Sequence, residues 1–220
     1  LSNHSRVIAF ELIQIVLKQH QNLDKVLEEH LRLNTLEKRD RAFIRHLATT
    51  TLRRLGQIDD LINQCIKHPL PRRATAARDV LRVGVCQLMF MNTPAHAAVN
   101  TTVSIVDNIK IKHYKKLINA VLRRIAREGQ NLIQKQDAEY LNTPKWLWES
   151  WCKTYGEVSC RNIATTHLRE PPLDITVKRD VKRWASCLNA TVLATGTLRI
   201  KKTYNKLKKE AWGMTKKLPL

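Results

Sequence analysis

The sequence predicts an all-α helical bundle, followed by linker helices and the first part of a small α+β subdomain. Three observations support this fold class. The 220 residues include only 6 Gly and 7 Pro, and aromatic residues make up 5% of the chain, which disfavours Gly-rich nucleotide-binding folds and turn-dense β-sandwiches. Apolar residues recur at helical spacing from the N-terminus onward. The period-two alternation of a half-buried strand occurs only beyond residue 170.

The N-terminal quarter predicts four helices. Apolar residues at helical spacing in 5–18 and 23–31 predict two short amphipathic helices. A third helix is predicted to begin with Thr35 as its N-cap and to run to a break at Gly56. A fourth helix is predicted at 59–67, where the following His-Pro-Leu-Pro run stops it, because the residue before a proline is pushed out of the helical region.

The middle of the chain contains the most apolar helix. Residues 74–91 place apolar side chains on a broad surface, so we expect this helix to be buried on most sides at the centre of the bundle. An Asn-Thr-Pro turn separates it from a helix at 95–107. The Lys-rich loop 110–116 then leads into a further amphipathic helix, which we expect to end at Gly129.

Beyond Gly129 the pattern changes. A Trp-rich helix is predicted with Thr143 as its N-cap and Pro144 in its first turn. It is followed by a predicted helix at 158–168, a strand at 173–177, a helix at 180–188 and a strand at 197–200.

We therefore divide the chain into four segments. These are the helical domain at 1–130, linker helices at 131–168, a partial α+β subdomain at 169–202 and a basic tail at 203–220 whose composition permits disorder. From residue 201 the sequence carries seven Lys against one Glu. Such an end is either an RNA-binding tail or the product of a frameshift or premature stop in a longer gene, and we favour the second.

The charge balance points to an anionic partner. The chain has 39 Lys and Arg against 19 Asp and Glu, a formal charge of +20. Clustered basic residues release counterions when they bind phosphate, and Arg adds planar bidentate contacts. Solvated faces kept for solubility and a lipid surface are the alternatives. The candidate RNA-binding residues are Arg39, Arg41, Arg45, Lys115, Lys116, Arg123, Arg124 and Arg127.

Motifs that carry catalysis are missing from the sequence. It has no phosphate-binding Gly-rich loop, no dinucleotide fingerprint, no His-Glu-x-x-His and no Gly-x-Ser-x-Gly. The five Cys are scattered without a Cys-x-x-Cys pair, which fits reduced thiols rather than disulfides or zinc. We expect no catalytic, cofactor-binding or metal-binding residues.

Three conspicuous features have a structural interpretation that we prefer. Cys86 lies in the central apolar helix and is expected to be a core residue. His96 and Asn100 are expected to cap a helix or hold a loop rather than to act as a base. The Trp cluster at 146, 148 and 151 is expected to pack against a neighbouring layer rather than to form a base-stacking platform.

Four stretches, in this order, carry a family resemblance. They are EKRDRAF at 37–43, LRVGVCQL at 81–88, TPAHAAVN at 93–100 and LINAVLRRI at 117–125. Together they resemble the NusB-like domain at the N-terminus of ribosomal RNA cytosine-C5 methyltransferases of the RsmB/Sun type. Later, EPPLDITVK at 170–178 and TGTLR at 195–199 resemble the start of the small subdomain that precedes the catalytic domain in that family. The chain departs from the family at Thr49, Thr50 and Thr101, near helix contacts.

This resemblance implies an RNA-binding bundle joined to a domain that methylates cytosine with S-adenosylmethionine. The cofactor loop and the nucleophile motifs of that domain do not occur in this sequence. We therefore expect a non-catalytic chain without a cofactor, derived from a truncated relative of the methyltransferases. A fragment of an active methyltransferase, and a docking module for a ribosomal or transcription-complex protein, are the alternatives.

RNA, and ribosomal RNA in particular, is the expected partner. The sequence has no apolar stretch long enough to span a bilayer and no signal peptide, so we expect a cytoplasmic protein without a membrane partner. Direct RNA contact predicts that the six candidate arginines lie together on one exposed face. Docking to a protein instead predicts an exposed apolar patch.

Overall fold

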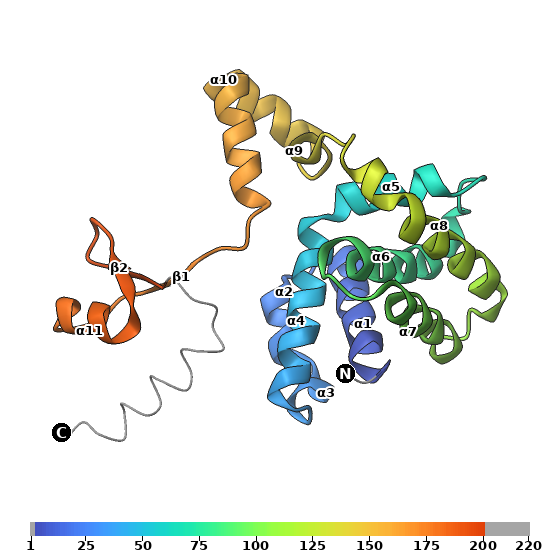
Figure 1. Ribbon diagram of the computed structural model, residues 1–220, viewed down its shortest axis with the longest axis horizontal. Coiled ribbons are helices and arrows are strands. Elements are labelled where there is room, and N and C mark those ends of the chain that lie inside the picture. Colours follow the sequence, from blue (N-terminus) through green and yellow to red (C-terminus); the bar gives the residue numbers. More distant parts are fainter. Residues whose placement is uncertain (1–2, 201–220) are drawn as a thin grey trace. The chain divides into compact units, whose positions relative to one another are not determined.

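The computed structural model describes residues 3–200, and these divide into two compact units after Leu168. The first unit is helical (Figure 1). Its elements are α1 (Asn3–Gln19), α2 (Leu23–Glu29), α3 (Leu31–Asn34), α4 (Lys38–Arg53), α5 (Leu55–Cys65), η1 (Arg72–Ala74), α6 (Thr75–Phe90), α7 (Ala95–Asn108), η2 (Lys112–Tyr114), α8 (Lys115–Ile133), α9 (Ala138–Leu141) and α10 (Lys145–His167). The second unit contains β1 (Leu173–Ile175), α11 (Val181–Leu188), β2 (Ala190–Val192) and β3 (Leu198–Ile200). The predicted fold class is confirmed.

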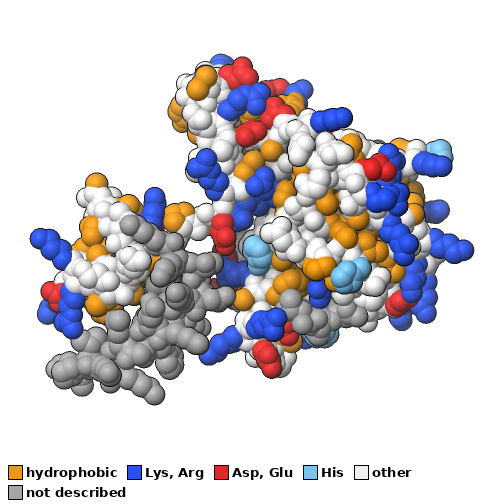
Figure 2. All heavy atoms as spheres, in the orientation of Figure 1, with side chains coloured by type: hydrophobic (Ala, Val, Ile, Leu, Met, Phe, Trp, Pro, Cys, Tyr) orange, Lys and Arg blue, Asp and Glu red, His pale blue; other side chains and the backbone are white. Residues whose placement is uncertain are grey.

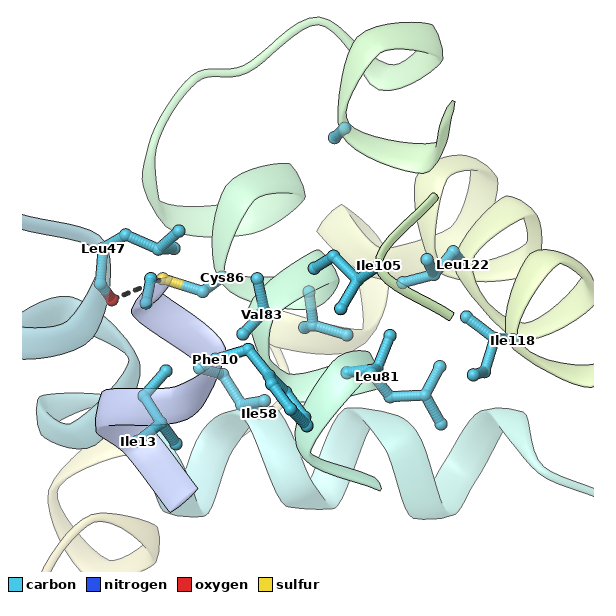
Figure 3. Close-up of a cluster of buried hydrophobic side chains, with 14 of the residues drawn as sticks. Phe10, Ile13, Leu47, Ile58, Leu81, Val83, Cys86, Ile105, Ile118 and Leu122 are labelled. Atoms are coloured by element: carbon cyan, nitrogen blue, oxygen red, sulfur yellow. Dashed lines mark hydrogen bonds between the residues drawn. The ribbon is translucent and has the colours of Figure 1, made fainter. Parts of the chain in front are cut away.

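Helix α6 lies at the centre of the bundle, as the sequence predicts. It contacts α4, α1, α7, α8 and α5, and in this order each of these helices also contacts the next, so that together they form a ring around α6. Leu81, Val83 and Cys86 of α6 lie among buried side chains from all five helices (Figure 3). A helix that is apolar on most sides can bury each side against a different neighbour, and each fully buried Leu or Ile contributes roughly 1.5–3 kcal/mol.

Two clusters of polar side chains lie in this core or at its edge, and hydrogen bonds between the helices pair their members. The Arg6 guanidinium on α1 donates to the side-chain oxygen of Gln87 on α6 at 2.8 Å. Asp79 on α6 accepts a hydrogen bond from Arg82 at 2.8 Å, and Arg82 also donates to Asp59 on α5 at 2.6 Å. Because a buried charge without a partner is costly, these bonds hold α1 and α5 in register with the central helix.

Three predicted helix ends are wrong. The third predicted helix begins at Lys38 with Glu37 as its N-cap, and Thr35 instead follows the short helix α3. Gly56 lies inside α5 rather than at a break, because the chain turns at Arg54. Gly129 is buried within α8, which continues to Ile133. Both glycines are sites of close packing rather than helix caps.

The helices end instead at residues other than glycine. His20 follows α1 with a φ of 54°, Asn92 follows the end of α6 with a φ of 49°, and Lys110 follows the end of α7 with a φ of 58°. This left-handed conformation closes a helix, and it is normally taken by glycine because a Cβ is disfavoured there. The chain therefore carries no glycine signal at these boundaries.

The helices α9 and α10 join the bundle through the first turn of α5. The side-chain oxygen of Asn142, in the turn between α9 and α10, accepts hydrogen bonds from the backbone N–H groups of Gly56 (3.0 Å) and Gln57 (3.2 Å). These are first-turn N–H groups of α5, which its own N-cap, Arg54, leaves without a side-chain acceptor. Asn142 therefore caps α5 from a distant part of the sequence.

The predicted Trp-rich helix and the helix after it are the two halves of α10. They meet at Gly156, whose φ of 79° and ψ of 163° interrupt the helix. The predicted N-cap is wrong, because Thr143 donates its hydroxyl hydrogen bond to the carbonyl of Glu139 and Pro144 occupies the cap position. The kink lets the second half fold back, so that Cys160 donates from its thiol to the carbonyl of Trp148 at 3.7 Å.

The second unit is a three-stranded antiparallel sheet with one helix. The strand order is β1-β3-β2, with Leu173 opposite Ile200 in one pair and Ala190 opposite Ile200 in the other. The sequence predicts β1, α11 and β3 but misses β2, which is only three residues long. Leu188, Leu198 and Ile200 form its small buried core. The basic tail expected at 203–220 lies outside the described residues.

Candidate nucleic-acid interface

Helix α8 carries one continuous basic face. Lys116, Arg123 and Arg127 follow each other at spacings of seven and four residues, which places them on the same side of an α-helix. All three are exposed. Within residues 3–200 none of them pairs with a carboxylate, although Arg123 donates to the amide oxygen of Asn119 at 3.3 Å. The opposite side of α8 faces the core, so this face points to solvent.

Two other candidates flank this face but are engaged by acidic side chains. Lys115 pairs with Asp107 of α7 at 2.7 Å. Arg124 pairs with Glu128 at 2.9 Å, and the hydrogen bond and negative charge of Glu128 raise the pKa of Arg124. Exposed pairs of this kind are weak and salt-sensitive, so a phosphate can replace the carboxylate. Both residues remain positively charged next to the α8 face.

A second, broader group of basic residues, here called the α4 face, covers the exposed half of α4: Lys38, Arg41 and Arg45 share one side at spacings of three and four, and Arg39 lies on another. Arg39 and Arg41 are exposed, and no carboxylate pairs with either among the described residues. Arg45 pairs with Asp24 of α2 at 2.6 Å, in a contact where both side chains are more than half exposed. Lys38, which the candidate set omits, extends this face at the start of the helix. In the sequence Lys38 directly precedes Arg39, and this position could have identified it as a further candidate.

The structure does not bring the two groups together. In the ring around α6, α4 and α8 are separated by α5 on one side and by α1 and α7 on the other. Figure 1 shows α4 and α8 well apart, and Figure 2 shows Lys and Arg side chains gathered over the side of the bundle where α8 lies. The single arginine face that direct RNA contact predicted is therefore wrong, and the assignment of these residues to RNA binding stays a prediction. The candidates form an α4 face and an α8 face.

The structural roles predicted for Cys86, His96 and Asn100 have different outcomes. Cys86 is fully buried, as predicted, and burial raises the pKa of its thiol to about 12. His96 and Asn100 are exposed on α7, which has Pro94 at its cap position. His96 donates to no neighbour within the described part of the chain, so the predicted capping role is wrong. No side chain among the described residues caps the first turn of α7.

The Trp cluster is only partly buried. Trp148 lies edge-on to Tyr140, with ring centroids 5.3 Å apart, and the Arg161 guanidinium lies 5.2 Å from its ring centre. Trp151 packs edge-on against His167 across the kink of α10. Trp146, by contrast, is 70% exposed, so packing accounts for two of the three Trp.

Two further kinds of feature are not found in the part of the chain that the structure describes. Within 3–200, no three His, Cys, Asp or Glu side chains come close enough together to hold a metal ion. No helix in the same range is long and apolar enough to cross a bilayer.

Known proteins resemble this chain in sequence and in fold. The NusB family matches residues 3–127. Ribosomal RNA small subunit methyltransferase B of Shigella boydii is 33% identical over 177 residues, which cover 79% of this chain and 40% of that protein. The solved NusB of T. maritima superposes with a TM-score of 0.51 at 26% identity, covering 57% of this chain and 90% of its own. NusB in a solved complex with NusE and dsRNA gives the same TM-score at 21% identity, covering 57% and 95%.

These likenesses agree on one part of the chain. The NusB family match covers more than half of the sequence and includes the ring of helices around α6 except for the last turns of α8. The chain spans about 40% of the length of the methyltransferase relative. By sequence and by fold, this chain belongs to the NusB family.

Proposed function

We propose that this chain binds RNA through the basic faces of α4 and α8, and that the RNA is ribosomal. The observation that carries the proposal is the α8 face, where Lys116, Arg123 and Arg127 are exposed, aligned and without a carboxylate partner among the described residues. A protein surface that holds cations in this way attracts a polyanion. Two similar proteins support RNA, rather than DNA or lipid, as the partner: NusB, which is solved in complex with dsRNA, and the ribosomal RNA methyltransferase relative.

The α8 face suits a phosphate backbone physically. From Lys116 to Arg127 the helix rises by about 16 Å, at 1.5 Å per residue, so its side chains can reach several phosphates in a row. Each cation that replaces a condensed counterion makes binding more favourable at low salt. Arg additionally presents two parallel N–H groups to one phosphate, which fixes the orientation of the contact.

We propose that this chain by itself does not catalyse methyl transfer. The sequence lacks the cofactor and nucleophile motifs of the methyltransferases, and it spans about 40% of the length of the relative. In a longer protein the bundle would hold ribosomal RNA, while S-adenosylmethionine and the nucleophile would belong to the remaining part. The fragment and truncated-relative interpretations both agree with this division of labour.

The proposal is tested by measuring affinity for a structured ribosomal RNA fragment and for duplex DNA of equal length, each across roughly 50–200 mM salt. We expect at least a tenfold preference for the RNA throughout. A triple variant, Lys116→Ala, Arg123→Ala and Arg127→Ala, should weaken RNA binding and reduce the slope of log affinity against log salt by about 2–3, because about 0.7–0.9 is lost per phosphate contact.

A matched control removes three charges from outside both faces, with Lys25→Ala, Lys67→Ala and Lys153→Ala on exposed positions. It should leave affinity and slope close to those of the native chain. Equal binding of RNA and DNA, with equal losses in both triple variants, would mean that net charge alone explains the binding. The RNA proposal would then be withdrawn.

A protein-docking role is the second candidate, and the exposed apolar residues of α10 favour it. Trp146 is 70% exposed, Val158 77% and Tyr155 58%. The solved complex pairs NusB with NusE, so NusE is the probe for docking, but α10 lies outside residues 3–127, which match the NusB family. Isothermal titration with NusE therefore distinguishes two surfaces. Trp146→Ser with Val158→Ser should weaken binding at least tenfold if α10 is the contact surface, and binding that ignores both substitutions would exclude α10 and leave the bundle as the contact.

A further inference from the structure

The two helices that flank α8 in the ring, α5 and α7, carry no Lys or Arg. The sequence of α5, LGQIDDLINQC, and that of α7, AHAAVNTTVSIVDN, contain neither Lys nor Arg, and α5 carries Asp59 and Asp60. In the ring around α6, α5 separates α4 from α8 on one side, and α7 with α1 separates them on the other. On α1, Arg6 is buried and Lys18 pairs with Asp79 of α6. Among the ring helices, exposed cations without a carboxylate partner within residues 3–200 therefore gather on α4 and α8.

Each face carries three exposed cations of its own with which to contact RNA phosphates. At the start of α4, Lys38 and Arg41 share one side of the helix and Arg39 lies on another side, so the α4 face is the exposed half of that helix. The α8 face presents Lys116, Arg123 and Arg127 on one side. All six are exposed and unpaired with carboxylates within residues 3–200. The buried sides of both helices face α6. Their exposed faces therefore point away from a common centre, in different directions.

One straight RNA helix cannot lie on both faces. To reach from α4 to α8 it would have to bend around α5, past the carboxylate of Asp60, which no cation pairs with within residues 3–200, or around α1 and α7. A duplex is stiff over the width of a protein domain, and carboxylates facing a phosphate backbone repel it. Two separate RNA segments meet neither obstacle, because each can lie along its own helix.

We propose that the α4 and α8 faces bind two RNA segments at the same time, so that the bundle bridges them. This inference rests on the proposed RNA-binding function and adds its geometry. The two segments can be neighbouring helices of one folded RNA or belong to two molecules. Within one RNA, binding of the first segment raises the local concentration of the second, which strengthens binding without further contacts.

The test uses the full chain and two short RNA hairpins of the same sequence, one carrying a donor fluorophore and the other an acceptor. At equimolar protein and hairpin pairs we expect energy transfer between the hairpins. A large excess of protein should abolish it, because each hairpin then occupies a different protein molecule. Isothermal titration should give two hairpins per chain. A single RNA that contains both hairpins should bind at least tenfold more tightly than either alone.

Two triple variants separate the faces. Lys38→Ala, Arg39→Ala and Arg41→Ala remove the α4 face, whereas Lys116→Ala, Arg123→Ala and Arg127→Ala remove the α8 face. Each variant should still bind one hairpin but lose energy transfer. The scattered triple control described above should keep both binding events. Circular dichroism confirms that each variant remains folded, and light scattering gives the oligomeric state.

The outcomes separate this inference from the function on which it rests. If the native chain binds one hairpin without energy transfer, the RNA-binding proposal stands and bridging is wrong. Energy transfer that persists in both face variants, or that occurs only where light scattering shows a dimer, also overturns bridging, because a different site or a second copy then holds the second hairpin. If the native chain binds the ribosomal RNA fragment but no hairpin, bridging is wrong and the RNA-binding proposal stands. If it binds neither, both proposals fail.

Discussion

Gly56 lies against the backbone of Leu141, at the end of α9. For a substitution at this glycine, helix propensity and tertiary packing predict opposite changes in the free energy of unfolding. Gly56 lies within α5, where replacement by alanine should by itself stabilise the helix by about 1 kcal/mol. In the folded chain, however, a Cβ at Gly56 would lie 1.7 Å from the carbonyl oxygen of Leu141. Backbone cannot yield as a side-chain end can, so α9 and the turn that follows must move away from α5.

The cost of Gly56→Ala follows from the bonds that depend on this approach. Asn142 accepts from the N–H groups of Gly56 and Gln57 and donates to the side-chain oxygen of Gln57. Losing these three bonds at about 1 kcal/mol each costs about 3 kcal/mol, which the gain in propensity reduces to a net loss of about 2 kcal/mol. We therefore expect Gly56→Ala to destabilise the first unit.

Urea unfolding followed by circular dichroism measures the net effect, and hydrogen exchange locates it. The variant should unfold at lower urea, and amides of α9 and the first turn of α5 should exchange faster. Gly129→Ala is the matched control, because its Cβ would meet the flexible side chain of Met89, 2.7 Å from the sulfur, rather than backbone. It should cost clearly less. If Gly56→Ala raises the urea midpoint, the reasoning from close approach is refuted.

Three further predictions concern other parts of the molecule. Arg82→Ala should lower the free energy of unfolding by about 3 kcal/mol or more, because it leaves the buried Asp79 carboxylate without its closest cation. The thermal midpoint should fall accordingly, and an unchanged midpoint would contradict this prediction. In pulsed alkylation read by mass spectrometry, exposed Cys187 should be labelled in the native chain, and Cys86, whose pKa burial raises to about 12, only on unfolding. The hydrogen bond from Arg199 lowers the pKa of Asp174 below its ordinary value of 3.8. The stabilisation from that pair is therefore present above pH 3.8 and lost as pH falls through the folded pKa, and NMR titration of Arg199→Ala should return the pKa of Asp174 towards 3.8.

Much of the helical core could be predicted because its signal is local and repeats along the chain. The predicted central helix at 74–91 corresponds to α6 at Thr75–Phe90, and the helix predicted at 95–107 corresponds to α7 at Ala95–Asn108. Apolar residues at helical spacing define a face that must be buried, whichever neighbour buries it. The same argument identified Cys86 as a core residue.

Helix ends could not be read in this way. Gly56 and Gly129 suggested caps, but both lie within helices, because their missing Cβ serves contacts with distant segments. The real ends at His20, Asn92 and Lys110 use the left-handed conformation without glycine. The cap on α5 comes from Asn142, some 86 residues along the chain from Gly56. A local pattern does not contain such partners.

The sequence alone was enough to predict a helical bundle with a basic surface, because composition, helical periodicity and net charge are properties of the chain itself. Only the tertiary structure separated the candidate residues into an α4 face and an α8 face. Arg41 and Arg123 are the same residue type, and nothing in the sequence distinguishes the surface on which each of them lies. The direction in which each one points depends on how its helix packs around α6, and that packing joins residues distant in sequence.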